Sequence, residues 1–288
     1  MYLGDAAIGL KPGSVKKLRV VALRYKPAEI GWGWADRTNR VYGAEALPIT
    51  QYGASVMPIA SPSGAFDVKV ILGDVPVEAD GSAHFTVPAR TPVYFQLLDD
   101  RGRAVQTMRS WTTLQPGEIQ SCVGCHENKN TTPLVQGASG TTAALRAAPR
   151  ALTPFYGHER GFSYIREIQP ILDRHCVRCH QVGGLNPRFP LTAERVRSPF
   201  PEGSKQGRYS KRWWLRPYLT LTDYDPTVTP VPYRTSTRWL KWIGRLSDPP
   251  LQPPYQYGAV VSPLFDLLVA GHGGRVALSA EELEKLAA

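Results

Sequence analysis

Two short stretches of the chain share one unusual pattern: residues 121–130 read SCVGCHENKN, and residues 175–180 read HCVRCH. In each, two cysteines are separated by two residues, and a histidine follows the second cysteine directly. The chain has four cysteines, so the two motifs use all of them. The residue pattern before the first motif differs from that around the second. The two motifs therefore belong to two different parts of the molecule. The motif residues are Cys122, Cys125 and His126, and then Cys176, Cys179 and His180.

The part before the first motif carries the signals of β-strands. Short runs of β-branched and aromatic residues alternate with turn dipeptides such as Asp80-Gly81 and Arg101-Gly102. Such runs predict strands, and their spacing is typical of a small antiparallel sandwich. The predicted strands cover residues 15–25, 66–72, 83–88 and 93–99.

The part around the second motif carries the signals of short helices between proline-rich loops. Apolar residues at helical spacing over 163–175 predict a helix that Pro170 kinks or shortens. Ser262 followed by Pro263 predicts the start of another helix. The stretch 186–257 is rich in proline and tryptophan, so we expect mostly irregular loop packed on something large and apolar.

Three kinds of site use paired cysteines at this spacing. A four-cysteine zinc site usually has about 15 to 20 residues between its pairs, whereas residues 126–175 separate them here. A thioredoxin-like dithiol starts a helix after a strand, and neither motif has that context. In c-type haem attachment both thiols form thioethers with the porphyrin and the adjacent histidine binds the iron. Only this reading needs the histidines, so the sequence predicts two covalently bound c-type haems.

These observations together predict an α+β protein with several domains. Residues 1–127 are expected to form a β-sandwich-like domain that ends in the first haem site. Residues 128–159, rich in Thr, Ala, Gly, Pro and Arg, are expected to form a linker. Residues 160–288 are expected to form a mainly α cytochrome c-like domain with long loops and the second haem site.

The ligand on the second face of each iron decides what a haem does. His272 lies in a glycine-rich turn after the helix predicted at Pro263, and we predict that it binds the iron opposite His180. The alternative is a histidine that interacts with the helix dipole. His175, directly before Cys176, is expected to face away from that side, in a surface or propionate contact. The predicted iron ligands are therefore His126, His180 and His272.

For the first haem the residues leave the second ligand open. Met108, His84, His158 and Tyr156 are all candidates, and a vacant position that admits a small molecule is equally consistent.

The ends of the chain and its apolar content bear on its cellular location. The opening MYLGDAAIGL lacks the pattern of a secretory signal, and the chain stops about two turns after a capping box of Ser279 and Glu282. We expect an internal part of a longer protein. No apolar run of about 18 residues occurs, so we expect no transmembrane helix. Because thioethers to haem are made outside the cytoplasmic membrane in bacteria, we expect a periplasmic or otherwise extracytoplasmic protein.

The formal net charge is +10, but the basic residues are scattered. Nucleic-acid binding needs a basic stripe interleaved with aromatic residues, and the nearest candidate is SKRWWLRPY at 210–218. Its tryptophans serve equally well as core or cofactor packing, so we expect no nucleic-acid partner. Arg174 and Arg178 are natural partners for haem propionates.

Residues 73–128, GDVPVEADGSAHFTVPARTPVYFQLLDDRGRAVQTMRSWTTLQPGEIQSCVGCHEN, resemble the middle domain of the hydrazine synthase alpha subunit family. RGFSYIREIQPILDRHCVRCH, at 160–180, and YGAVVSPLFDLLVAGHGGRVALSAEELEKL, at 257–286, resemble the cytochrome c domain that follows it. The resemblance implies an accessible haem in the middle domain, a bis-histidine haem in the last domain, and a preceding β-propeller that this chain lacks.

The resemblance implies that the haem on His126 is the reactive one and that the haem on His180, opposite His272, passes electrons to it. Hydrazine-forming members carry a tyrosine shortly after the first motif, where this chain has residues 127–130, ENKN. The function expected first is therefore a dihaem electron-transfer module that works with redox partners or other subunits. The alternatives are a haem enzyme of hydrazine synthase type, with a small nitrogen compound at the first haem, and a zinc-binding interaction domain.

Overall fold

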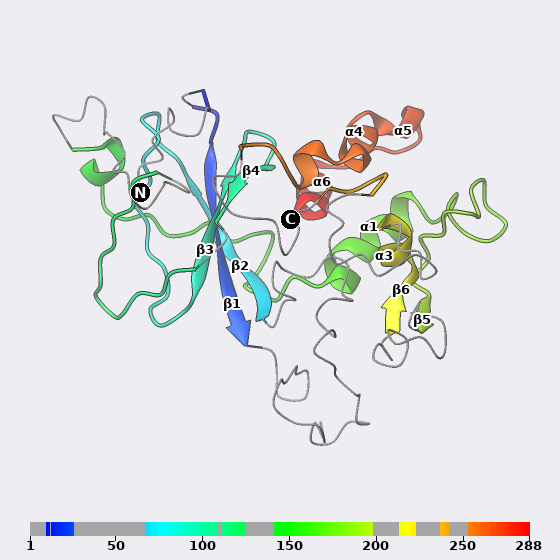
Figure 1. The fold of residues 1–288 in the computed structure, drawn as a ribbon, viewed down its shortest axis with the longest axis horizontal. Helices are drawn as coiled ribbons and strands as arrows, with labels where there is room; N and C mark the ends of the chain where they lie inside the picture. Colours follow the sequence, from blue (N-terminus) through cyan, green and yellow to red (C-terminus); the bar gives the residue numbers. More distant parts are fainter. Residues whose placement is uncertain are drawn as a thin grey trace, which may run out of the picture.

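Figure 1 shows the computed structural model, with the strands on one side and the short helices on the other. The C-terminal helix α6 (Ala280–Ala287) lies beside the sheet, so the end of the chain returns to its beginning. The structure describes residues 10–11, 13–25, 67–108, 111–124, 141–197, 213–222, 237–241 and 253–288.

One antiparallel sheet with the strand order β2-β1-β3-β4 organises the first part of the chain. The central strand β1 is buried on both faces, since Leu18, Val20 and Ala22 join the apolar core while Arg19 and Val21 are enclosed on the opposite face. Its β-branched residues suit such a two-sided position. The strands are β1 (Lys17–Tyr25), β2 (Asp67–Pro76), β3 (Val93–Leu98) and β4 (Ala104–Thr107).

Three of the four predicted strands are confirmed, and they are β1, β2 and β3. Residues 83–88 are not a strand, because within them Phe85 makes an isolated bridge to Arg150. Strand β4 was not predicted, because its four residues are too few to show an alternating pattern. The described residues hold this single large sheet and a small pair, β5 (Arg195–Arg197) with β6 (Trp213–Leu215), in place of the two facing sheets of a sandwich.

Residues within 150–161 lie along the outer edge of β2, where Thr153 bridges to Asp74 and Gly161 to Val70. The Thr153 amide donates to the Asp74 carbonyl at 2.8 Å, and the Asp74 amide donates back at 2.9 Å. This approach needs Gly73, which has a φ of +147°, because a Cβ there would lie 2.4 Å from the Thr153 carbonyl oxygen. A stretch predicted as part of a linker thus extends the sheet's hydrogen bonding.

The second part of the chain consists of short helices. A π-helical turn, η4 (Tyr164–Ile168), leads directly into α1 (Gln169–His175), and Pro170 sits in the first turn of α1 as the prediction of a shortened helix requires. The remaining helices are η3 (Ala143–Arg146), α3 (Arg216–Leu221), η5 (Ala259–Val261), α4 (Pro263–Val269) and α5 (Gly271–Gly274).

Both helix starts predicted near the C-terminus are confirmed. Ser262 is the N-cap of α4 and Pro263 follows it. The capping box of α6 is complete, since the Glu282 amide donates to Ser279 Oγ at 3.2 Å and the Ser279 amide donates to Glu282 Oε2 at 2.9 Å. Among the described residues, no helix has the length and apolarity to cross a membrane.

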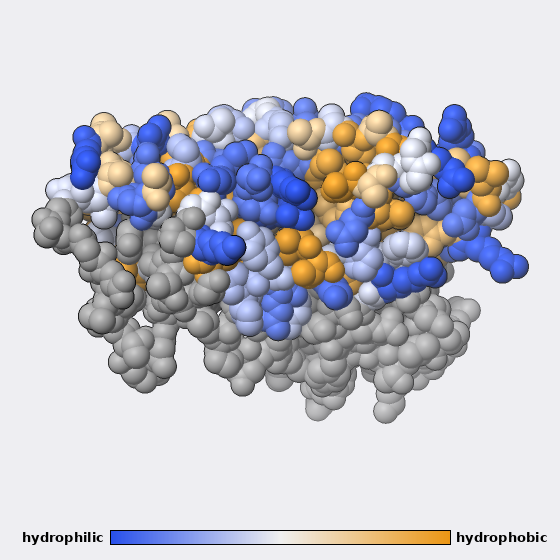
Figure 2. Space-filling model, turned by 90° about the horizontal axis from the view of Figure 1, so that it is seen from above, coloured by the Kyte–Doolittle hydropathy of each residue, from blue (hydrophilic) through white to orange (hydrophobic). Residues whose placement is uncertain are grey.

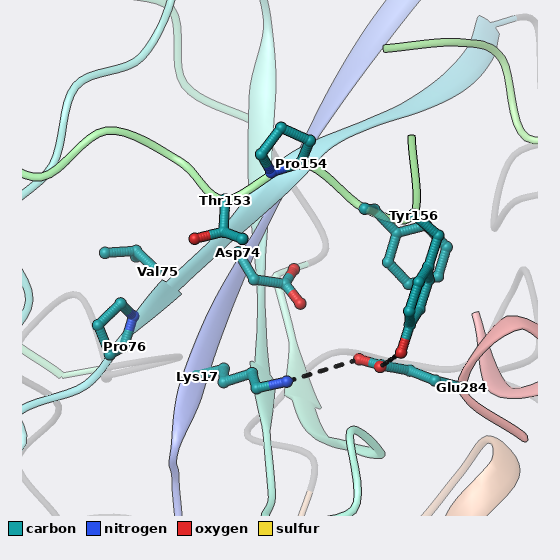
Figure 3. A pocket seen from close by; sticks show the side chains of 9 residues that line it. Lys17, Asp74, Val75, Pro76, Thr153, Pro154, Tyr156 and Glu284 are labelled. Carbon is teal, nitrogen blue, oxygen red and sulfur yellow. Dashed lines mark hydrogen bonds and ion pairs between the residues drawn. The ribbon is translucent and has the colours of Figure 1, made fainter. Parts of the chain in front are cut away.

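A buried charge cluster joins α6 to the sheet. Arg19, with 1% of its surface exposed, donates two hydrogen bonds to the Asp74 carboxylate at 2.8 and 3.0 Å and one to Glu284 at 2.8 Å. Its guanidinium lies 4.3 Å from the centre of the Phe155 ring, and Tyr156 donates to Glu284 at 2.5 Å. Figure 3 shows Asp74, Tyr156 and Glu284 among the residues that line a hollow of about 250 Å³ beside this cluster.

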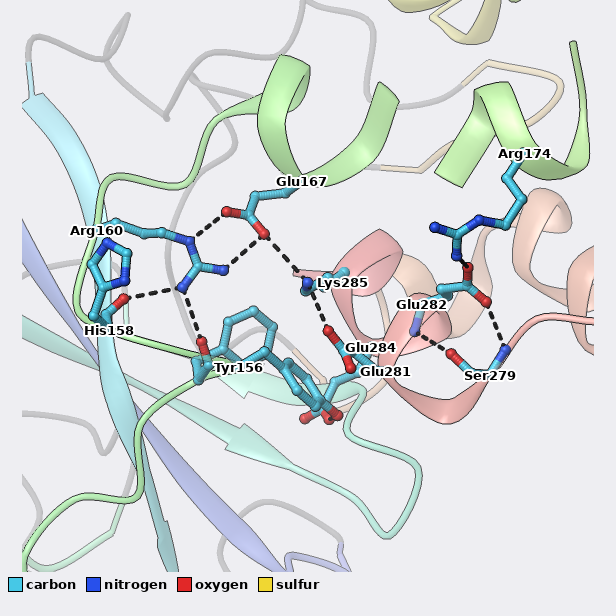
Figure 4. Close-up of polar contacts among 11 residues, drawn as sticks. Tyr156, His158, Arg160, Glu167, Arg174, Ser279, Glu281, Glu282, Glu284 and Lys285 are labelled. Atoms are coloured by element: carbon cyan, nitrogen blue, oxygen red, sulfur yellow. Dashed lines mark hydrogen bonds and ion pairs between the residues drawn. The ribbon is translucent and has the colours of Figure 1, made fainter. Parts of the chain in front are cut away.

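The other face of α6 contacts the helices that lead to the second motif. Glu282 accepts from Arg174 at 2.8 Å and pairs with His175 Nε2 at 2.9 Å. Lys285 lies 3.5 Å from Glu167, which also holds Arg160 by two hydrogen bonds (Figure 4). Helix α6 therefore sets the position of α1 relative to the sheet.

Candidate functional site

The second motif begins where α1 ends. Cys176 is the C-cap of α1, and its amide donates to the Leu172 carbonyl at 2.8 Å. The His180 amide donates to the Cys176 carbonyl at 3.0 Å, so the motif continues as a tight turn that carries both thiols and the imidazole together. Cys176 and Cys179 are half-buried free thiols.

His180 is held in one orientation by its neighbours. Its Nδ1 donates to the Phe189 carbonyl at 3.0 Å, and the Phe189 ring meets the imidazole edge-on at 5.5 Å. Metal-binding histidines commonly donate one ring nitrogen to a carbonyl, because this fixes the tautomer that leaves the other nitrogen free to coordinate. Burial lowers the pKa of His180 despite that hydrogen bond, and the nearby His272 adds to the lowering.

His272 lies in a strained turn after α4, and its ring lies close to the ring of His180. Residues 271–274, GHGG, all have positive φ values, and that of His272 is 49°. A histidine rarely adopts this left-handed conformation without a structural reason, and the flanking glycines adopt it at little cost. The turn is closed by the amides of Arg275 and Val276, which donate to the Gly271 carbonyl at 3.0 and 3.1 Å.

The two imidazoles face each other. The ring centres of His180 and His272 are 6.1 Å apart, and their planes differ by 25°. A metal–imidazole bond is about 2.0 to 2.1 Å long, so two histidines on opposite sides of one metal have ring centres about 6 Å apart. The measured 6.1 Å between ring centres equals the spacing that the predicted pair of axial ligands requires, and the shared metal itself stays a prediction.

The surroundings of the histidine pair suit a large apolar group. Val182 and Leu185, just after His180, are 93% and 81% exposed, and Val269, just before the His272 turn, is also exposed. Figure 2 views the molecule from above Figure 1. On the face that it shows, apolar side chains gather over the half that the helices occupy. A porphyrin seated between the two imidazoles would cover apolar surface that the chain itself leaves exposed.

The thiols do not suit redox or zinc chemistry. Reactive cysteines have a lowered pKa and favour helix N-termini, but burial, with Cys179 beside it, raises the pKa of Cys176 to about 11, and the motif follows the C-terminus of α1. Within the described residues, no three His, Cys, Asp or Glu side chains form a group that could hold a metal ion. Attachment of a haem by thioethers at Cys176 and Cys179 stays a prediction from the motif.

Among the candidate histidines, His175 is paired with Glu282 on the outer side of α1 and is not part of the facing pair. His84 Nδ1 donates to the Ala147 carbonyl at 3.3 Å, and His158 is exposed. Tyr156, a candidate for the first haem, has its hydroxyl engaged by Glu284. Met108 follows β4, and its amide donates to the Phe95 carbonyl at 2.8 Å.

The sequence did not single out the aromatic residues that shape the site. The Phe189 ring packs between His180 and Trp239, which lies edge-on at 5.5 Å, and Tyr164 packs edge-on against Tyr218 at 6.4 Å. The available signal was the concentration of aromatic residues in loops that have no core of their own.

Comparison with known proteins bears on the first part of the chain. Residues 13–127 match the family model for the hydrazine synthase alpha subunit middle domain. This part of the chain is similar to the hydrazine synthase alpha subunit middle domain. This confirms the resemblance seen in the sequence before the first motif.

One protein and one solved structure, both from Kuenenia stuttgartiensis, are similar to parts of this chain. Hydrazine synthase subunit alpha is 43% identical over 62 residues, which are 22% of this chain and 8% of that protein. A chain of the solved structure of Kuenenia stuttgartiensis Hydrazine Synthase aligns with 82% of this chain and 32% of its own length, at 20% identity and a TM-score of 0.49. The chain therefore spans a small part of each hydrazine synthase relative.

The first motif lies at the end of the hydrazine synthase-like region. Residues 111–124 begin beside the start of β3, where Thr112 pairs with Val93. They include Cys122, a half-buried free thiol. Cys125 and His126 lie outside the described residues. The exposed apolar residues along this segment are Trp111, Ile119 and Val123.

Proposed function

We propose that this chain binds two c-type haems and transfers electrons outside the cytoplasm as part of a redox assembly. The observation that carries the proposal is the facing pair of His180 and His272, 6.1 Å apart, directly beside two free thiols. Two axial imidazoles leave no free coordination position, which is the arrangement of an electron-transfer haem.

The residues of this second site have separate roles in the proposal. Cys176 and Cys179 attach the porphyrin, and His180 and His272 bind the iron. The Phe189 carbonyl keeps His180 in the coordinating tautomer. The haem, when bound, supplies the one-electron couple, and the protein holds both ligands fixed so that little rearrangement accompanies electron transfer.

The first site is proposed to carry its haem on Cys122, Cys125 and His126. The family match ends at residue 127, directly after this motif, and so favours a second candidate function for this site. In that candidate the haem on His126 keeps an open position and acts on small nitrogen compounds, as the name hydrazine synthase suggests, while the haem between His180 and His272 supplies or removes electrons.

The partners proposed follow from the same relationship. The curated relative is named as a subunit, so we infer that this chain also works with other subunits or redox proteins. Export follows from the proposed haem attachment, which takes place outside the cytoplasmic membrane. A zinc-binding interaction domain remains the contrasting hypothesis.

The test is the spectrum of protein matured with a haem-attachment system. We expect two covalent haems by mass, no stoichiometric zinc, and at least one low-spin signal by electron paramagnetic resonance. His272→Ala should convert that low-spin haem to high spin, whereas His158→Ala, which changes an exposed histidine remote in sequence from the second motif, should leave the low-spin signal of that haem unchanged. A matured protein without covalent haem would reject the proposal, and a His272→Ala spectrum identical to that of the parent would remove His272 as a ligand.

A further inference from the structure

Three consecutive backbone carbonyls beside His180 each accept a hydrogen bond from a different part of the chain. They belong to Phe189, Pro190 and Leu191. His180 Nδ1 donates to the first at 3.0 Å. Thr220 Oγ1, on α3, donates to the second at 2.9 Å, and Gln169 Nε2, on α1, donates to the third at 3.1 Å. Two helices thus hold the segment that carries the acceptor of the His180 ring.

The same segment is also joined to the backbone of the second motif. The Leu191 amide donates to the His180 carbonyl at 2.9 Å, and the Asn186 amide donates to the Cys179 carbonyl at 2.9 Å. Movement of this segment would therefore disturb both the backbone of His180 and the partner of its ring.

The side chain of Gln169 is better explained by what it holds than by packing. Gln169 is 3% exposed, and its Nε2 also donates to Asp173 at 2.8 Å. Its Oε1 is buried and has no partner among the residues that the structure describes. Because two acceptors face the same end of the amide, the contacts fix that end as the nitrogen. An apolar side chain of similar size would fill the space without leaving a buried oxygen unpaired.

Resting on the proposed function, we infer that Gln169 and Thr220 are positioning residues that tune the haem bound by His180, because they hold the Phe189 carbonyl in place. That carbonyl keeps the ring proton on Nδ1, which leaves Nε2 free to coordinate, and it makes the imidazole a more basic ligand. A more basic ligand favours oxidised iron, so these two contacts lower the reduction potential.

The first measurement needs no haem. In the full chain produced without haem attachment, the ring nitrogen shifts of isotope-labelled histidines show which nitrogen of each imidazole carries the proton. The His180 signals are those that His180→Gln removes. At about pH 8, where imidazoles are neutral, we expect the Nδ1–H form in the parent. Thr220→Val and Gln169→Met, which nearly conserve size, should each raise the share of the Nε2–H form by about threefold or more.

The second measurement is the potential of the haem-loaded protein. The same two variants should keep both haems attached and the His180–His272 haem low-spin. The equilibrium constant for reduction of that haem should rise by about threefold to tenfold, an increase in potential of roughly 28 to 59 mV for one electron. Thr220→Ser keeps the hydroxyl and should match the parent. The matched control is Thr222→Val, because Thr222 Oγ1 is bonded to the Tyr218 carbonyl at 2.7 Å at the end of the same helix. It should change neither reading.

Parent-like readings in both Thr220→Val and Gln169→Met would overturn the inference and leave the proposed function intact. So would an equal shift in Thr222→Val, because the cause would then be general loosening of α3. If Gln169→Met fails to fold, Thr220→Val and Thr220→Ser decide the matter. A parent that matures without haem at the second motif would overturn the proposed function and the effect on potential, while the haem-free measurement would still decide whether the two helices orient His180.

Discussion

The sheet and the helical part of this molecule are stabilised in different ways. The core of the sheet is filled by its own side chains, and Leu18, Val20, Val75 and Val93 have no exposed surface. The helices that the structure describes in the second part are at most eight residues long, and apolar residues near both histidines stay exposed. Isolated helices of this length are marginal in water. The difference teaches that the sheet is a scaffold stabilised by its own core, whereas the proposed function makes the helical part depend on a haem bound between its segments.

The largest expected effect tests this dependence. The double change Cys176→Ser and Cys179→Ser should abolish haem attachment at the second motif. Amide hydrogen exchange over 164–180 and 259–276 should then accelerate by about 100-fold or more, because a tightly bound ligand stabilises the residues that hold it. Exchange over 17–25 should change little.

Mass-spectrometric hydrogen exchange on the matured protein measures both regions at once. The changes to serine conserve size, and Cys122→Ser, which lies in the first motif, is the matched control. If the sheet and the helical part lost protection equally, the contrast between scaffold and ligand-dependent region would be wrong.

The next effect concerns the link between the two parts. Arg19→Met should lower the free energy of unfolding by about 3–5 kcal/mol, because it leaves the Asp74 and Glu284 carboxylates without their buried partner. Arg150→Met is the control, since Arg150 and its partner Glu78 are 51% and 30% exposed, and such a pair is worth no more than about 1 kcal/mol.

Denaturant titration of the haem-loaded variants gives both free energies. Hydrogen exchange over 280–288 should also accelerate in Arg19→Met, because Glu284 on α6 loses the hydrogen bond that Arg19 on β1 donates to it. Equal losses for the two arginine variants would show that the buried cluster adds nothing beyond a surface ion pair.

The smallest effect is a pH dependence within the helical part. Hydrogen bonds from the Ser279 amide and His175 lower the pKa of Glu282 to about 2. An unfolded glutamate has a pKa of about 4.3, so the folded state holds the ionised form more strongly. The stability contributed by Glu282 is therefore complete above about pH 5 and is lost as the pH falls toward 2.

Thermal melts of the parent and of Glu282→Gln between pH 6 and pH 2.5 measure this contribution. The difference in melting temperature should shrink toward the acid end, because the parent loses the ionised carboxylate that the variant lacks throughout. A constant difference over this range would assign the stability to packing of α6 rather than to the charge.

Local patterns in the sequence predicted much of the structure. The β-branched runs predicted β1, β2 and β3, and Ser279 with Glu282 predicted the start of α6, because propensity and capping depend on neighbouring residues. The GHGG segment predicted a turn that positions His272, since glycine readily adopts the left-handed conformation. The repeated motif also predicts the residues of the second haem site from chemistry alone, and this stays a prediction.

Contacts between distant residues came only from the tertiary structure. Nothing near Arg19 in the sequence indicates that a charged residue on a central strand is buried, because its partners Asp74 and Glu284 lie 55 and 265 positions away. The placement of residues within 150–161 along β2 also depends on a partner strand. Residue types and spacing thus determined the main elements and supplied the haem-binding hypothesis. Tertiary packing decided which elements meet, and it brought His180 and His272 face to face, because such contacts depend on the whole chain closing on itself.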